Sequence, residues 1–212
     1  TAQLLNETAR YTALWMTYED TIRVADLKTR RSRFQRVSTE AKIGAEQIME
    51  VREYLHPMSE EIADTLPTPI GKWILRTKPV TKTIERISEN GIILNTASIS
   101  GYCLLYFVAR LKPIRPRSLR FNLEQERIEA WLTKIADLAP KNYELACEIA
   151  ECANVIKGYG ETHRNGWRNF TAIMVEVDKV SNNSDAASRI KELRLAALAD
   201  EDGTKLRNYL NA

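Results

Sequence analysis

From Thr1 to Ile43 the chain contains neither glycine nor proline, so no residue in this stretch is a strong helix breaker. Apolar side chains recur there at intervals of four, three, four and three residues: Tyr11, Trp15, Tyr18, Ile22 and Ala25. This spacing places them on one face of a helix. The sequence therefore predicts one long amphipathic helix, which ends at about Gly44.

Helix breakers are scarce in the rest of the chain too, with eight glycines and seven prolines among 212 residues. Helical periodicity predicts further helical segments over residues 45–55, 58–66, 70–77, 80–88, 98–111, 118–138 and 142–156, of which Pro57 either kinks or divides the first two, and three more after Gly160, the last of them short. Only residues 92–96, IILNT, favour an extended segment, and one strand does not make a sheet. We therefore predict an all-α fold, an irregular bundle of about eight or nine helices in a single domain over residues 1–212.

The segment SISGYCLLYFVARL, residues 98–111, is nearly all apolar. Such a helix belongs in a protein interior, so we expect it to be the most buried helix, with Ser98 or Ser100 as its N-cap. Its longest apolar run, Tyr102 to Ala109, is too short to span a bilayer, and we predict no membrane partner. The three cysteines make no disulfide framework, which favours a reducing, cytoplasmic compartment.

Three glycines, Gly158, Gly160 and Gly166, fall within the stretch KGYGETHRNGWRNF, between Lys157 and Phe170. Their spacing matches neither a dinucleotide fingerprint nor a P-loop, and a predicted helix precedes them where a Rossmann fold would have a strand. Amphipathic helices are predicted on both sides, and glycine suits the left-handed backbone of a tight turn. The stretch therefore predicts a helix–turn–helix corner with structural glycines.

The same corner holds the residues that we would test for contact with a ligand or partner, because a helix N-terminus favours anions such as carboxylate or phosphate. They are Lys157, Tyr159, His163 and Arg164. We predict no catalytic residue and no metal site in this chain. The two histidines are far apart in sequence, and three scattered cysteines are too few for a [4Fe–4S] cluster. We expect the thiols to be buried and inert.

The net charge is only +3, but the basic residues are clustered. One cluster contains Arg30, Arg31 and Arg33. A second contains Arg115, Arg117 and Arg120, and no acidic residue occurs between Glu89 and Glu124. Such clusters form either solvated helix faces or a docking surface for an acidic partner. Nucleic acid is the weaker option, because no helix-turn-helix, zinc-finger or RNA-binding signature accompanies them.

Three stretches of the sequence resemble one enzyme family: RYTALWMTYEDTIRVADLKTRRSRF, EVREYLHP and, most specifically, AECANVIKGYGETHRNGWRNF. They are similar to the helical C-terminal region of the beta subunit of indolepyruvate oxidoreductases. These enzymes belong to the thiamine-diphosphate-dependent 2-oxoacid:acceptor oxidoreductases. The likeness covers most of the chain.

The resemblance implies an accessory helical domain, not catalytic alone, that supports subunit docking in the oxidative decarboxylation of aryl pyruvates to aryl-acetyl-CoA. It implies that thiamine diphosphate and iron–sulfur clusters belong to the whole enzyme and that this fragment carries no cofactor. The expected partner is the other subunit or an α/β oxidoreductase domain upstream of Thr1. Two alternatives stay open: a stand-alone helical protein-interaction module and, less favoured, a helical nucleic-acid binder.

Overall fold

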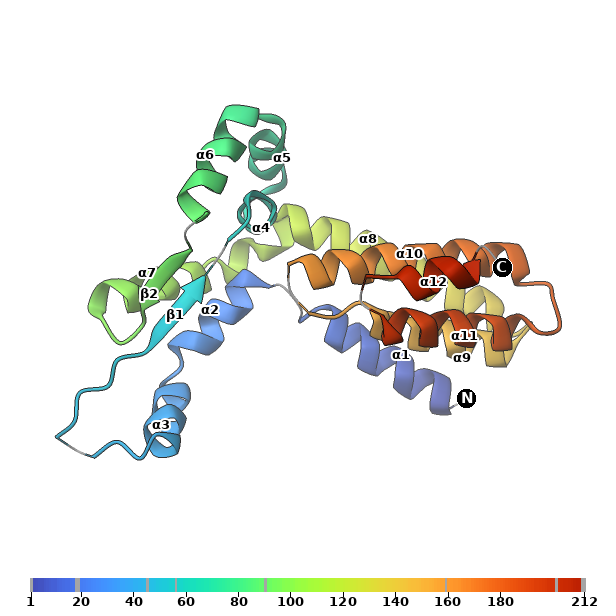
Figure 1. The fold of residues 1–212 in the computed structure, drawn as a ribbon, viewed down its shortest axis with the longest axis horizontal. Coiled ribbons are helices and arrows are strands. Elements are labelled where there is room, and N and C mark those ends of the chain that lie inside the picture. Colours follow the sequence, from blue (N-terminus) through green and yellow to red (C-terminus); the bar gives the residue numbers. More distant parts are fainter. Residues whose placement is uncertain are drawn as a thin grey trace. The chain divides into compact units, whose positions relative to one another are not determined.

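The computed structural model describes residues 2–17, 20–44, 46–55, 57–89, 91–158, 160–200 and 202–210. Within these ranges the chain forms twelve α-helices, two short 3₁₀ helices and one two-stranded ribbon (Figure 1). The all-α prediction is confirmed, and the described part alone contains more helices than the eight or nine expected.

The chain divides into two compact units: unit 1 comprises Thr1–Glu19 and Gln125–Ala212, and unit 2 comprises Asp20–Glu124. The boundary at Gln125 falls inside one continuous helix, α8 (Leu119–Leu138). The expectation of a single domain over residues 1–212 stays a prediction.

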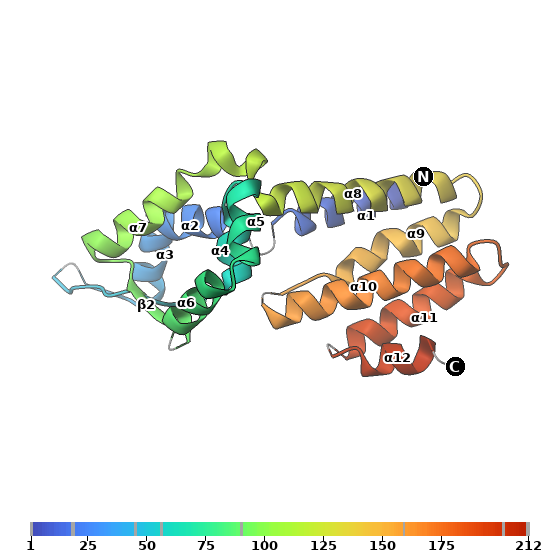
Figure 2. The same cartoon turned by 90° about the horizontal axis from the view of Figure 1, so that it is seen from above.

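Unit 1 is a bundle in which α9 packs against α1 and α11, and α11 packs against α10 and α12 (Figure 2). Besides the C-terminal part of α8, its elements are α1 (Ala2–Trp15), α9 (Tyr143–Cys152), η2 (Ala153–Val155), α10 (Glu161–Val180), α11 (Ala186–Ala199) and α12 (Thr204–Leu210). The apolar faces of these helices are the faces that are buried. Ile149, Ile173, Val177, Ile190 and Leu193 are fully buried in one continuous core.

An aromatic cluster forms part of that core. The ring of Trp15 lies 5.5 Å from Trp131, 5.0 Å from Trp167 and 5.5 Å from Phe170, in tilted or edge-on geometry. Such pairs add to the stabilisation that large buried rings already give. The indole Nε1–H of Trp131 donates to the carbonyl of Ile149 at 3.0 Å, so its burial leaves no polar group unsatisfied.

A buried ionic cluster joins α9 to α11. Nη2 of Arg194 lies 2.8 Å from Oε2 of Glu148 and 2.7 Å from Oε2 of Glu151, and the Arg194 side chain is only 9% exposed. Beside it, burial raises the pKa of the Cys152 thiol well above its usual range. The two carboxylates compensate the buried guanidinium, which would otherwise be costly to remove from water.

Unit 2 contains shorter helices and the ribbon. Its elements are α2 (Thr21–Thr29), α3 (Arg31–Glu40), β1 (Arg52–Leu55), α4 (Ser59–Thr65), α5 (Thr68–Arg76), α6 (Lys78–Ser88), β2 (Ile92–Asn95), α7 (Ile99–Ala109), η1 (Lys112–Arg117) and the first turns of α8. The strands β1 and β2 pair antiparallel, with Arg52 opposite Asn95 and Leu55 opposite Ile92. The helix α2 packs against α7, and α5 packs against α4 and α6 (Figure 1).

Two of the predicted elements are wrong. A helix was expected over residues 45–55, but residues 46–51 are irregular and β1 follows them, because β2 supplies backbone partners that a local pattern does not reveal. The single long helix expected before Gly44 is three helices. Asp20 begins α2 as its N-cap, and its side chain accepts a hydrogen bond from the backbone N–H of Arg23 at 3.1 Å.

Burial is unequal between the units, although they have similar lengths. Among the described residues, the buried hydrophobic side chains of unit 2 are Ile22, Ala25, Ala63, Ile74, Leu105 and Leu119. The continuous core cluster draws all of its members from unit 1. Since apolar burial is the main favourable term in folding, unit 2 is the less self-sufficient part. Among the helices described, none combines the length and the apolar character that a membrane crossing needs.

We expect Arg194→Met to lower the free energy of unfolding by about 3 kcal/mol, because it leaves Glu148 and Glu151 without their buried counter-charge. Lys191→Met, at an exposed position of the same helix, is the matched control and should change stability little. Urea unfolding followed by circular dichroism measures both. Equal midpoints for the two variants would contradict a structural role for the ionic cluster.

Candidate functional site

The helix α7 is apolar on nearly every side, yet most of it faces solvent. Only Gly101 and Leu105 are buried, whereas Ile99 is 86% exposed, Leu104 53% and Phe107 69%. The prediction that this helix would be the most buried one is wrong. A contiguous apolar surface of this kind on a folded domain marks an interaction site.

The local structure fixes where α7 begins. Ser98 is the N-cap, one of the two residues predicted for this role: its Oγ accepts a hydrogen bond from the backbone N–H of Gly101 at 3.2 Å and donates to the carbonyl of Asn95 at 2.6 Å. At Gly101 a Cβ atom would lie 2.0 Å from that same carbonyl oxygen. The first turn of α7 therefore packs directly on the end of β2, which only glycine permits.

A pocket of about 440 Å³ opens at this end of α7. Its lining residues come from α3, from the segment before β1, from the β2–α7 turn and from the first turns of α7: Phe34, Met49, Thr96, Ala97, Ser98, Ile99, Tyr102 and Cys103. The rings of Phe34 and Tyr102 lie 6.4 Å apart, and Tyr102 stacks on Tyr106 at 6.0 Å. The wall is therefore mainly aromatic and aliphatic, and it continues onto the exposed side of α7.

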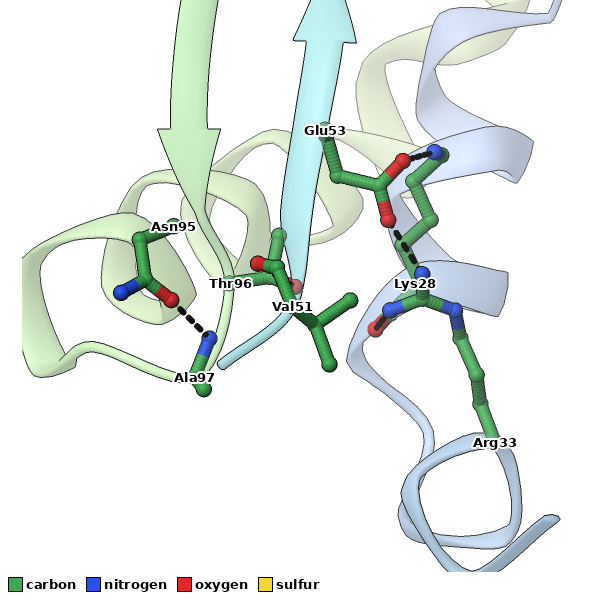
Figure 3. Close-up of polar contacts among 7 residues, drawn as sticks. All are labelled: Lys28, Arg33, Val51, Glu53, Asn95, Thr96 and Ala97. Carbon is green, nitrogen blue, oxygen red and sulfur yellow. Dashed lines mark hydrogen bonds and ion pairs between the residues drawn. The ribbon is translucent and has the colours of Figure 1, made fainter. Parts of the chain in front are cut away.

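An ionic clamp holds the elements around the pocket together (Figure 3). Glu53 on β1 accepts hydrogen bonds from Lys28 on α2 and Arg33 on α3, and its side chain is 13% exposed. Burial alone would raise the pKa of Glu53, but Lys28 and Arg33 outweigh it and hold the pKa below its ordinary value. On the β2 side, buried Thr96 donates from its backbone N–H to the carbonyl of Val51 at 2.8 Å.

The corner between Lys157 and Phe170 has the predicted architecture. The helix α9 is continued by η2, and α10 begins at Glu161. Gly158 and Gly160 have φ of +79° and +60°, the left-handed geometry for which glycine was expected. The structural interpretation of these two glycines is confirmed.

The polar residues of this corner are engaged within the protein. His163 is buried, and its Nε2 accepts a hydrogen bond from the indole N–H of Trp167 at 3.0 Å. Arg164 lies 2.6 Å from Glu161, whose pKa is lowered by that hydrogen bond and by the charge of Arg164. Lys157 lines a cavity of about 10 Å³, which has room for about one water molecule. Tyr159 lies outside the described residues.

The six arginines predicted as a basic surface differ in their surroundings. Four of them form ion pairs inside unit 2: Arg30 with Asp26, Arg33 with Glu53, Arg115 with Asp20 and Arg120 with Glu124. Arg31 and Arg117 form none with the residues that the structure describes. Much of the clustered charge thus holds the fold together and is not free for a partner.

The three cysteines differ in their surroundings. Cys147 and Cys152 are buried in unit 1, as expected, whereas Cys103 is exposed on α7 in unit 2, which corrects the expectation of buried thiols. In the described ranges no group of three or more His, Cys, Asp and Glu side chains is placed to hold a metal ion.

Comparison with protein families gives a match over residues 1–176, to a family described as "Family of unknown function (DUF6537)". The chain belongs to this family. No curated protein and no solved structure matches it.

The pocket and the uncovered face of α7 were missed at the sequence level. A helix that is apolar all round is normally a core helix, and the sequence does not tell whether a core or a partner covers it. One signal was present: the apolar segment has arginines and a lysine after it and no acid between Glu89 and Glu124. A helix that is buried in its own protein does not need basic residues, without any acidic ones, next to it in sequence.

We expect Gly158→Ala to lower the free energy of unfolding by about 2 kcal/mol. The substitution strains a left-handed backbone and brings a Cβ atom to 2.7 Å from Cγ2 of Thr162. Gly160→Ala shares the positive φ but meets nothing within 4 Å, so it should cost only the backbone strain, about 1 kcal/mol. Thermal unfolding compares the two, and a Gly158→Ala protein as stable as wild type would refute the corner geometry.

For the clamp we expect Glu53→Gln to destabilise unit 2 at neutral pH. A carboxyl whose folded-state pKa is depressed contributes stability above its unfolded pKa and loses it as the pH falls through the folded value. The difference between wild type and variant should therefore shrink as the pH falls below the ordinary value of 4.5. Hydrogen exchange of β1 amides between pH 7 and pH 3, corrected for intrinsic rates, measures this; a constant difference would contradict the clamp.

Proposed function

We propose that this chain is a non-catalytic helical docking domain of an oxidoreductase subunit of the indolepyruvate type. It contributes to the assembly of the enzyme that converts aryl pyruvates to aryl-acetyl-CoA. The docking role is supported mainly by the solvent exposure of α7, a helix that is apolar on all sides and exposed on most of them. The oxidoreductase assignment rests on the three resembling stretches.

The composition of unit 2 supports the docking role. It buries few hydrophobic side chains, and it exposes large ones outside α7 as well, including Tyr54 at 70%, Trp73 at 57% and Ile93 at 58%. Aromatic side chains are enriched at the centres of protein interfaces, where they contribute much of the binding energy. A partner that covers α7 would supply the burial that unit 2 lacks.

A stand-alone interaction module would use the same surface with a different partner. A nucleic-acid interface is less favoured, because four of the six arginines that suggested it are paired with carboxylates. Nucleic-acid binding depends on protein cations that neutralise phosphates and so release the counterions condensed on the nucleic acid. The proposal places the thiamine diphosphate and iron–sulfur clusters in the other parts of the enzyme, as the resemblance implies.

The test uses matched substitutions of two leucines in the tagged natural protein. Leu104 on α7 is 53% exposed and Leu195 on α11 is 51% exposed. We expect Leu104→Ser to weaken retention of the partner subunit roughly tenfold, whereas Leu195→Ser leaves it unchanged. Pull-down followed by mass spectrometry identifies the retained protein, and acceptor reduction with indolepyruvate and coenzyme A measures assembly of the active enzyme.

Two outcomes contradict the proposal. One is a retained protein that is no 2-oxoacid oxidoreductase component, and the other is equal retention by the two leucine variants. We also expect the isolated chain to reduce no acceptor when it is supplied with thiamine diphosphate, Mg²⁺ and indolepyruvate. Turnover by the isolated chain would show that it is catalytic after all.

A further inference from the structure

We infer that the α7 surface takes an acidic helical segment of a protein partner. An apolar side chain of that segment enters the pocket beside Tyr102, and its carboxylates contact the basic residues that follow α7. This inference rests on the docking role proposed above and adds the chemistry of the partner.

The apolar half of the site is continuous. From the pocket, the aromatic stack of Tyr102 and Tyr106 leads to Phe107, whose ring lies 6.5 Å from that of Tyr106. Leu104 adds an exposed aliphatic side chain on the same helix, and Ile114 in η1 is 41% exposed. A partner helix that binds along α7 could therefore place one apolar side chain in the pocket, and its residues one turn further along could contact the apolar strip on α7.

The charged half lies at the other end of α7. Arg110, Lys112 and Arg117 are exposed, and the structure records no ion pair for them among the described residues. The guanidinium of Arg110 lies 4.7 Å above the ring of Tyr106, so the apolar strip runs directly into the basic end. Two acids of unit 2 are engaged by the neighbouring arginines, since Asp20 pairs with Arg115 and Glu124 pairs with Arg120.

The geometry sets a spacing for the partner. Tyr102 and Arg110 are eight residues apart on one helix, which corresponds to about 12 Å along its axis. A helical partner should carry its anchor and its acidic residues the same distance apart, which is seven or eight positions. Exposed carboxylates so placed would speed association and fix the orientation of the partner.

Two other occupants fit the surface less well. In a second copy of this chain, parallel α7 helices would bring the two basic ends together, and antiparallel ones would set each basic end beside the positive end of a helix dipole. A membrane-surface helix needs an apolar face and a strongly polar face. The helix α7 has no polar face, because its buried side and its exposed sides are both apolar.

The experiment pans the full chain against a displayed library of randomised helical peptides of about four turns. We expect the enriched peptides to carry a large apolar residue and, seven or eight positions away, two or more Asp or Glu residues. Phe107→Ser should abolish their binding. Circular dichroism confirms that each variant is folded.

A charge-reversal pair tests the basic end, with one enriched peptide measured by fluorescence anisotropy. Lys112→Glu/Arg117→Glu should weaken its binding roughly tenfold, and replacement of its acids by Lys should restore binding to that variant. Lys141→Glu/Lys191→Glu changes the net charge equally at exposed positions of unit 1 and should leave binding unchanged.

Three results of the peptide experiments would overturn the inference: enriched peptides that are neutral or basic, no enriched peptide at all, or equal binding to the charge-reversed variant. Two further results would also overturn it. One is a dimer in sedimentation velocity, and the other is binding to phosphatidylserine vesicles, in each case if Phe107→Ser abolishes it. The two proposals fail separately. If Leu104→Ser loses the oxidoreductase partner in the pull-down but the library yields no acidic peptides, only the inference about charge is wrong. If the library yields acidic peptides but the pull-down retains no oxidoreductase component, only the oxidoreductase assignment is wrong.

Discussion

The contact of Trp15 with Trp131, Trp167 and Phe170 holds together three helices, α1, α8 and α10, that are distant in sequence. It draws the N-terminal helix into the same core as the C-terminal half of the chain, with unit 2 inserted between them in sequence. Removal of a large buried ring lowers the free energy of unfolding considerably. Unit 1 is therefore stabilised in large part by this cluster and by the buried ion pairs of Arg194. The described residues of unit 2 form no comparable core.

Natural sequences are usually consistent from local pattern to global packing, and exceptions concentrate where function requires them. The helix α7 is such an exception in this chain. Its composition suits an interior, its N-cap and the close approach at Gly101 fix its position, and its outer faces are left without cover. The docking role that we propose would account for this conflict between composition and exposure.

Charge in unit 2 serves two purposes. The ion pairs of Glu53 with Lys28 and Arg33 connect α2 and α3 to β1, where few apolar contacts are available. The pair of Asp20 with Arg115 connects the start of α2 to η1. Arg110, Lys112 and Arg117 form no ion pair with the described residues, and they lie where α7 ends. Basic residues of unit 2 therefore both hold the unit together and give this part of its surface a positive charge.

The sequence by itself determined the helices from α8 to α12 and the corner at Gly158 and Gly160. Periodicity, caps and positive-φ glycines act within a few residues, so a local pattern records them. Only the tertiary structure decided three other matters: that residues 52–55 form a strand, that α7 is exposed, and which arginines are paired. A strand needs a distant partner for its backbone, as residues 92–95 supply here. Burial and ion pairing likewise depend on which surfaces meet, and a helix that is apolar on every side has the same sequence pattern whether its own core or another protein covers it.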